Sequence, residues 1–138
     1  MSDSPPEPSL DEAEAALFAR GVLEINTGYF FECHETLEDL WQGVRGPSRD
    51  FYQGLIQIAV ALYHLGRGNL AGARSLFERG LKRLEAYPPR YGGIELATLR
   101  DEARVWWARI EQGLSGEPDL DRLPKIRVAR REGGPGNT

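Results

Sequence analysis

The candidate functional residues of this chain begin in FFECHETLEDLW, positions 30–41, a stretch with helical period. It holds His34, one of two histidines, directly after the only cysteine and among four acidic side chains. At about 100° per residue, His34 lies near the apolar stripe of such a helix, and Glu38, one turn later, flanks that stripe. The other carboxylates, Glu35 among them, fall well away from the stripe, and we expect them in water.

A second polar seam lies on the next apolar stretch, RDFYQGLIQIAVALYHL at positions 49–65. Gln53, Gln57 and His64 fall within an arc of about 40°, and Arg49 lies at its edge. If the two stretches form an antiparallel hairpin, the seam on each helix can face the other. The second helix is apolar on most of its circumference, so we expect it to be the central helix of the fold.

Depth from the turn decides which side chains of such a hairpin can meet. Glu38 and Gln57 lie at similar depths, whereas His64 lies about 7 Å deeper than His34 along the axis. Helical side chains lean toward their own N-terminus, so the two imidazoles converge. The spacing therefore predicts a polar site of His34, Glu38, Gln57 and His64, provided that the two seams face one another.

Two chemistries are compatible with this set. In the first, the residues are structural, and buried His, Gln and Glu side chains satisfy one another's hydrogen bonds at the core margin. In the second, His34, Glu38 and His64 hold a divalent zinc or iron ion, and Glu35 is the catalytic acid or base of a metal-assisted hydrolysis. However, HETLE has a carboxylate where the H-E-x-x-H motif needs its second histidine.

A third interpretation is a pocket for a small ligand or a peptide. Trp41 would form a wall of this pocket, and Arg49 would anchor an anionic group. The neighbouring Cys33 lies on the apolar stripe, where we expect a small buried hydrophobe and not a nucleophile.

Five segments with helical period must position these residues. Ser9 and Glu12 have the spacing of a capping box before the first, and Asn69 is a cap for the fourth. Gly72 and Gly80 each cost a helix about 1 kcal/mol relative to Ala, so we expect close packing against the central helix there. No strand pattern is visible. We predict an all-α fold, a compact bundle of about five helices at 10–26, 29–44, 48–66, 70–87 and 95–112.

Length and charge limit the remaining possibilities. A chain of 138 residues with 41% apolar residues is expected to form one domain, at 9–116, with a disordered tail at 1–8 and an extended or disordered tail at 117–138. The formal charge of −4 argues against broad nucleic-acid binding. One cysteine, no secretory leader and no apolar run of about 18 residues indicate a cytoplasmic protein that does not enter the membrane.

Other features favour an interaction module. Residues 61–88 loosely resemble one tetratricopeptide-type hairpin, although one such unit does not make a solenoid. Trp106 and Trp107 are about 100° apart on a helix, so one indole can reach the core while the other is left for a partner or a homodimer contact. Partial burial of both is the other interpretation. The basic run at 125–131 is expected to be a solvated tail, although the alternation of Ile126 and Val128 could let it lie along the bundle before it frays.

The two motifs, aromatic-E-x-H-E-x-L-E-x-L-W and RDFYQGLIQIAVALYHLGRGNLAGA, resemble those of the Domain of Unknown Function 309 family over about residues 23–100. The resemblance implies a small bacterial or archaeal all-α protein without an established activity. The family pattern falls on the following positions: Glu32, His34, Glu35, Glu38, Trp41, Arg49, Gln53, Gly54, Gln57 and His64. Taken together, we predict a non-enzymatic binding or interaction module with a polar site between the second and third helices. A divalent-metal-dependent hydrolase is the alternative.

Overall fold

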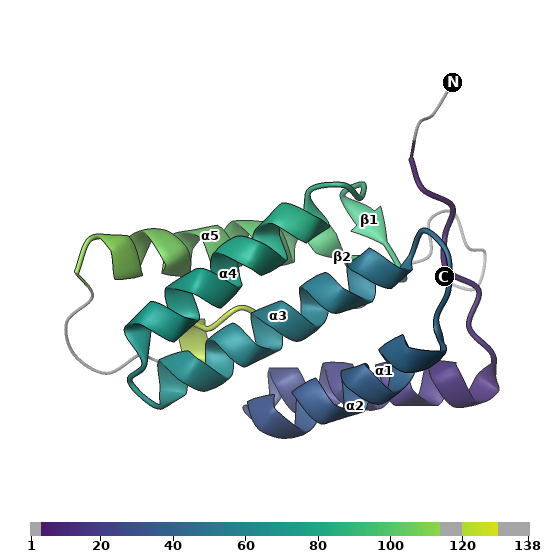
Figure 1. Ribbon diagram of the computed structural model, residues 1–138, viewed down its shortest axis with the longest axis horizontal. Helices are drawn as coiled ribbons and strands as arrows, with labels where there is room; N and C mark the ends of the chain where they lie inside the picture. Colours follow the sequence, from purple (N-terminus) through teal and green to yellow (C-terminus); the bar gives the residue numbers. More distant parts are fainter. Residues whose placement is uncertain (1–3, 114–119, 130–138) are drawn as a thin grey trace, which may run out of the picture.

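Five α-helices make up most of the described part of the chain, and Figure 1 shows their arrangement. A computed structural model of the protein describes residues 4–113 and 120–129. In Figure 1, the hairpin of α1 and α2 packs on one side of α3, while α4 and then α5 pack on the other side. The prediction of an all-α bundle is confirmed, with bounds close to those expected: α1 Glu12–Asn26, α2 Phe30–Gly43, α3 Arg49–Gly66, α4 Leu70–Leu84 and α5 Leu96–Glu111.

The central position of α3 follows from its composition. Eleven of its residues are buried, more than in any other helix described, because apolar side chains occupy nearly its whole circumference. A Cβ on Gly80 of α4 would lie 3.0 Å from the Gly54 carbonyl oxygen, and one on Gly72 would lie 3.1 Å from the His64 ring. The predicted close packing of α4 on the central helix at these two glycines is therefore confirmed.

Local side chains cap the N-termini of α1 and α4. The capping box of α1 lies at Asp11 and Glu14, each of which accepts a hydrogen bond from the other's backbone N–H. The predicted box at Ser9 and Glu12 is therefore wrong by two residues, because Asp11 and Glu14 have the same spacing. The predicted Asn69 cap is confirmed, since its side chain accepts from the Gly72 N–H at 2.9 Å.

A short antiparallel strand pair between α4 and α5 contradicts the expectation of no strands. β1 (Arg90–Tyr91) pairs with β2 (Ile94–Glu95). Gly92 and Gly93 form the turn with φ of 62° and 77°, a conformation that favours glycine at both positions. Two-residue strands are too short to show an alternating pattern, so their sequence gave no signal.

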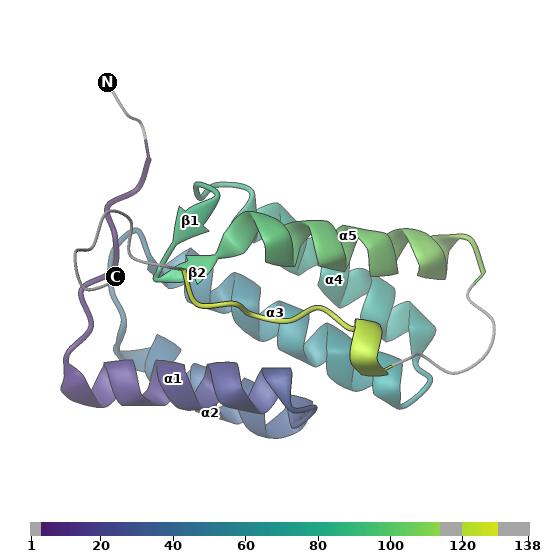
Figure 2. The same ribbon diagram turned by 180° about the vertical axis from the view of Figure 1, so that it is seen from behind.

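The last described segment, residues 120–129, is yellow in Figure 2, where it runs in front of α3. After a 3-10 turn at Leu120–Arg122, Leu123 and Ile126 are buried in the core. Asn26 holds the segment through two hydrogen bonds with the backbone of Ile126, at 2.7 and 2.8 Å. Of the predicted C-terminal tail, this part therefore packs on the bundle, and residues 117–119 and 130–138 lie outside the described residues.

The N-terminal residues 4–8 also make contacts with the bundle. The Tyr91 hydroxyl donates to the Pro6 carbonyl at 2.6 Å, and the Gly92 N–H donates to the Glu7 carboxylate at 2.9 Å. Residues 1–3 of the predicted tail lie outside the described residues. Within the described parts of the chain, no helix combines the length and the apolar content needed to cross a membrane.

Candidate functional site

The two histidines of the predicted site line one small groove between α2 and α3. Phe31 and His34 of α2 form one side, and Val60, Tyr63 and His64 of α3 form the other, around a volume of about 140 Å³. Ring centroids lie 5.8 Å apart for Phe31 and His34, 5.5 Å for Phe31 and Tyr63, and 5.9 Å for Tyr63 and His64. The imidazoles therefore lie at the two ends of an aromatic row. We call these five residues the α2/α3 groove.

His34 forms a hydrogen-bonded pair with Glu38, one turn later on the same helix. The distance between His34 Nε2 and Glu38 Oε2 is 2.9 Å. A carboxylate only accepts hydrogen bonds, so Nε2–H donates and Nδ1 is the other ring nitrogen. The Glu38 side chain is 45% exposed, so the pair adds no more than about 0.5 kcal/mol to stability.

His64 is oriented by the cap of α4. Asn69 Oδ1 accepts from the Gly72 N–H, which identifies Nδ2 as the atom 3.3 Å from His64 Nδ1. Because an amide nitrogen only donates, Nδ1 of His64 accepts, and a neutral ring carries its proton on Nε2. The start of α4 thereby sets the tautomer of the second groove histidine.

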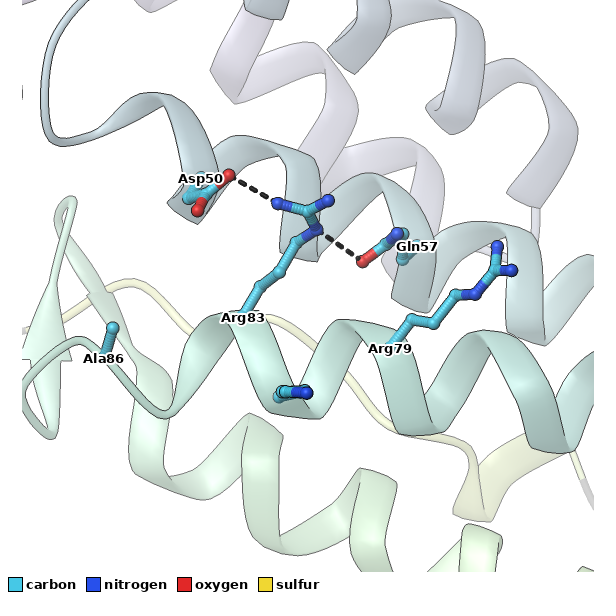
Figure 3. Close-up of a pocket in the computed structure, with 6 residues that line it drawn as sticks. Asp50, Gln57, Arg79, Arg83 and Ala86 are labelled. Atoms are coloured by element: carbon cyan, nitrogen blue, oxygen red, sulfur yellow. Dashed lines mark hydrogen bonds and ion pairs between the residues drawn. The ribbon is translucent and has the colours of Figure 1, made fainter.

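Gln57 faces α4 and does not meet Glu38. Its Oε1 accepts from Arg83 Nε of α4 at 3.1 Å, and Arg83 Nη1 also donates to Asp50. Figure 3 shows this guanidinium reaching from α4 to both side chains of α3. Along the polar seam predicted on α3, Gln57 thus contacts α4, whereas His64 lines the groove with α2 and also contacts the start of α4.

Arg49 stabilises the end of α2. Its Nη1 donates to the carbonyl oxygens of Trp41 at 2.8 Å and Val44 at 2.7 Å, and its guanidinium lies 3.8 Å from the Trp41 ring centroid. These contacts match a cation at a helix C-terminus that also stacks on an aromatic face. Trp41, the predicted wall of a ligand pocket, and Arg49, the predicted anion anchor, therefore contact one another. Neither belongs to the five residues of the groove.

The other predicted site residues do not complete a cluster. Glu35 is exposed and Gln53 is half-buried, and neither side chain has a hydrogen-bond partner among residues 4–113 and 120–129. Across the same residues, no group of three or more His, Cys, Asp or Glu side chains is arranged to hold a metal ion. The predicted metal ligands His34, Glu38 and His64 are therefore not brought together around one position.

Cys33 and the two tryptophans behave as core residues to different degrees. Cys33 is fully buried, and burial raises the pKa of its thiol to about 12, which leaves no thiolate near neutral pH.

Trp106 is buried and donates to the Arg122 carbonyl at 2.8 Å, whereas Trp107 is half-buried. One indole reaches the core, as expected, and a partner contact through Trp107 stays a prediction.

Two sets of residues were not predicted as part of any site. Phe31 and Tyr63 supply the aromatic walls of the groove. The sequence feature that could have indicated them is that each lies within one helical turn of a histidine. Arg79, Lys82 and Arg83 of α4 line an open hollow beside Gln57. Their signal was the spacing i, i+3 and i+4, which places three cations on one helix face.

Comparison with known proteins identifies a family for the central part of the chain. Residues 18–76 match the family described as "Domain of unknown function (DUF309)". The uncharacterized protein YpuF of Bacillus subtilis (strain 168) is 45% identical over 58 residues, which cover 41% of this chain and 33% of that protein. An uncharacterized protein of Aquifex aeolicus (strain VF5) is 31% identical over 115 residues, 83% of this chain and 32% of that protein. This chain thus spans about a third of the length of these curated relatives, and the predicted family resemblance is confirmed.

Proposed function

We propose that the DUF309 segment of this chain is part of a non-enzymatic binding module, whose α2/α3 groove takes one apolar side chain of a protein partner. The observation that carries the proposal is the groove itself, walled by Phe31, Tyr63 and two imidazoles above Val60. Its volume of about 140 Å³ is close to that of cavities that hold one benzene ring, about 150 Å³. Sites for whole small molecules usually measure about 300–1,000 Å³, so one ring-sized side chain is the better match.

Exposed apolar residues on the hairpin of α1 and α2 support a protein as the partner. Phe31 is 46% exposed, although it forms a wall of the groove. Leu23 and Tyr29, in the same α1–α2 region, are exposed too. Aromatic side chains are enriched where proteins bind one another, and exposed apolar groups lose contact with water on binding.

The rim of the groove adds polar groups that can orient a partner. His34 uses Nε2 for Glu38 and His64 uses Nδ1 for Asn69, so each ring keeps one nitrogen for another hydrogen bond. An apolar floor with a few hydrogen-bonding groups at its edge is the usual arrangement of a recognition site. These two nitrogens would recognise backbone or hydroxyl groups beside the inserted side chain.

The alternative function, a metal-dependent hydrolase, requires His34, Glu38 and His64 to share an ion. Since the described residues do not converge in this way, binding is the function that the geometry supports better. We further propose that the protein is cytoplasmic, since a chain with one cysteine does not depend on an internal disulfide and hence not on an oxidising compartment.

The proposal is tested by NMR titration with indole and with toluene, two probes for aromatic and apolar side chains. We expect saturable shifts of the ring signals of His34 and His64. Val60→Trp fills the groove and should abolish these shifts, whereas Val105→Trp, on an exposed position of α5, should leave them unchanged.

Two outcomes contradict the proposal. One is the absence of saturable shifts in the native protein, and the other is an equal loss in both variants. Titration with zinc chloride tests the alternative, because simultaneous broadening of both histidine signals at one equivalent would favour a metal site instead.

A further inference from the structure

A second concave surface lies between α3 and α4, where these two helices pack against one another. The hollow has a volume of about 520 Å³, within the usual range for small-molecule sites. Its lining differs from that of the α2/α3 groove, because three of its six residues are cations. The lining residues are Asp50, Gln57, Arg79, Lys82, Arg83 and Ala86. We call these six residues the basic hollow.

The arrangement of the cations follows from the periodicity of α4. Positions 79, 82 and 83 have the spacing i, i+3 and i+4, so they share one face of the helix, and Ala86 lies in the turn that follows α4. Figure 3 shows Arg79 and Arg83 both reaching from α4 toward α3, with Gln57 between their guanidinium groups. Ala86 has only a methyl group, which keeps the end of this face open.

The charges in the basic hollow are not balanced. Arg83 is paired with Asp50, but Arg79 and Lys82 have no hydrogen bond or ion pair within the part of the chain that the structure describes. Three cations and one carboxylate leave a formal charge of +2 in the hollow, although the whole chain carries −4. Two unpaired cations on one side of an acidic protein favour a compact anion of matching charge.

Gln57 adds a neutral donor beside the cations. The residue is 8% exposed, and its Oε1 accepts from Arg83 Nε. Because Oε1 is held in this way, the amide NH₂ of Gln57 is the group left to bind a ligand, and it has no partner among the described residues. Arginine and amide donors around a single position are the groups that recognise phosphate oxygens.

We propose that the basic hollow binds a small phosphomonoester. Arg79 and Lys82 would contact the phosphate dianion directly, and Arg83 would be a positioning residue that Asp50 holds against Gln57. A phosphate group carries a charge of about −1.5 to −2 at neutral pH, which matches the two unpaired cations. The hollow is much larger than this group alone, so the organic part of the ester lies over Ala86 and the aliphatic stems of the cations.

A small ester accounts for the charges better than a polyanion does. Nucleic acids are bound along extended basic tracks, whereas these cations occupy one turn of one helix. The net negative charge of the chain would also repel the rest of a long polyanion. This proposal does not depend on the α2/α3 groove, because the two surfaces share no residue.

The experiment is a titration of the full chain with phenyl phosphate, inorganic phosphate and benzyl alcohol, followed by calorimetry and by the NMR signal of the Gln57 amide. We expect saturable binding of phenyl phosphate, weaker binding of inorganic phosphate and no response to benzyl alcohol at the Gln57 amide. Arg79→Gln and Lys82→Gln should each weaken the binding of phenyl phosphate about tenfold, since each removes one charge-assisted contact.

The matched control is Arg104→Gln, which removes a cation paired with Asp101 on the exposed surface of α5. Its affinity for phenyl phosphate should equal that of the native protein. An equal loss in this variant, or no saturable shift at Gln57 with millimolar phenyl phosphate, overturns the proposal. So does binding of a single-stranded oligonucleotide or of anionic vesicles in the absence of phenyl phosphate binding, because the ligand would then be a polyanion.

Discussion

The contact of Gly80 with α3 leads to a prediction in which one substitution has opposite effects at two sites. In an exposed helix, Gly→Ala stabilises by up to about 1 kcal/mol, because alanine loses less backbone entropy. At Gly80, however, the new Cβ would lie 2.9 Å from Ile58 Cδ1 and 3.0 Å from the Gly54 carbonyl oxygen. The Ile58 side chain can rotate, but a backbone oxygen inside a packed helix cannot move away easily.

The expected size of the effect follows from these two opposing contributions. Overpacking of this kind costs about 1–3 kcal/mol, which exceeds the gain in helix propensity. We therefore expect Gly80→Ala to lower the free energy of unfolding by about 1 kcal/mol. Gly66 is the last residue of α3, and a Cβ added there would meet no atom within 4 Å. Gly66→Ala should therefore raise the free energy of unfolding by up to about 1 kcal/mol.

Urea denaturation followed by tryptophan fluorescence and by circular dichroism measures both variants. The same substitution should shift the midpoint downward at Gly80 and upward or not at all at Gly66. If Gly80→Ala stabilises the protein as much as Gly66→Ala does, α4 does not approach α3 as closely as described. The basic hollow depends on this approach, because it brings Arg83 to Gln57.

Three further predictions concern other parts of the fold. Burial raises the pKa of Tyr87, and that of Tyr91 to about 12, so the folded state holds these protons longer than the unfolded state does. The contribution of these two tyrosines to stability should be constant below about pH 10, where both states are protonated, and fall toward pH 12. A pH series of urea midpoints measures this fall, and Tyr91→Phe should flatten it. Cys33 should resist iodoacetamide at pH 8 until urea unfolds the protein, and fast labelling of the native protein, read by mass spectrometry, would contradict its burial. Asn26→Ala should cost about 1–3 kcal/mol and speed hydrogen exchange at the Ile126 amide, whereas unchanged exchange would mean that Asn26 does not hold the C-terminal segment.

The helices were predictable from the sequence because their causes are local. The apolar period of each segment and the Asn69 cap act within a few residues, so the predicted bounds lie within three residues of those observed. The predicted fourth helix extends to 87, but α4 ends at Leu84. Pro88 disfavours helical backbone at the residue before it, and Arg100 donates to the Leu84 and Tyr87 carbonyls instead.

The candidate site was predictable only in part. The spacing correctly placed His34 and Glu38 one turn apart, and the structure shows their hydrogen bond. The same reasoning put Gln57 opposite Glu38, whereas Gln57 contacts Arg83 of α4. Helical spacing says which side chains share an arc, but an arc of about 40° on α3 lies within reach of helices on both sides.

The five helices, the central position of the apolar third helix and the match of residues 18–76 to a known family all follow from the amino-acid sequence. The surface on which each polar side chain lies follows instead from the fold: His34 and His64 line the groove between α2 and α3, and Gln57 lies in the hollow between α3 and α4. Helix period acts over a few residues, whereas the partner of a side chain depends on how whole helices pack. Here that packing depends on the close approach of α3 and α4 at Gly54 and Gly80.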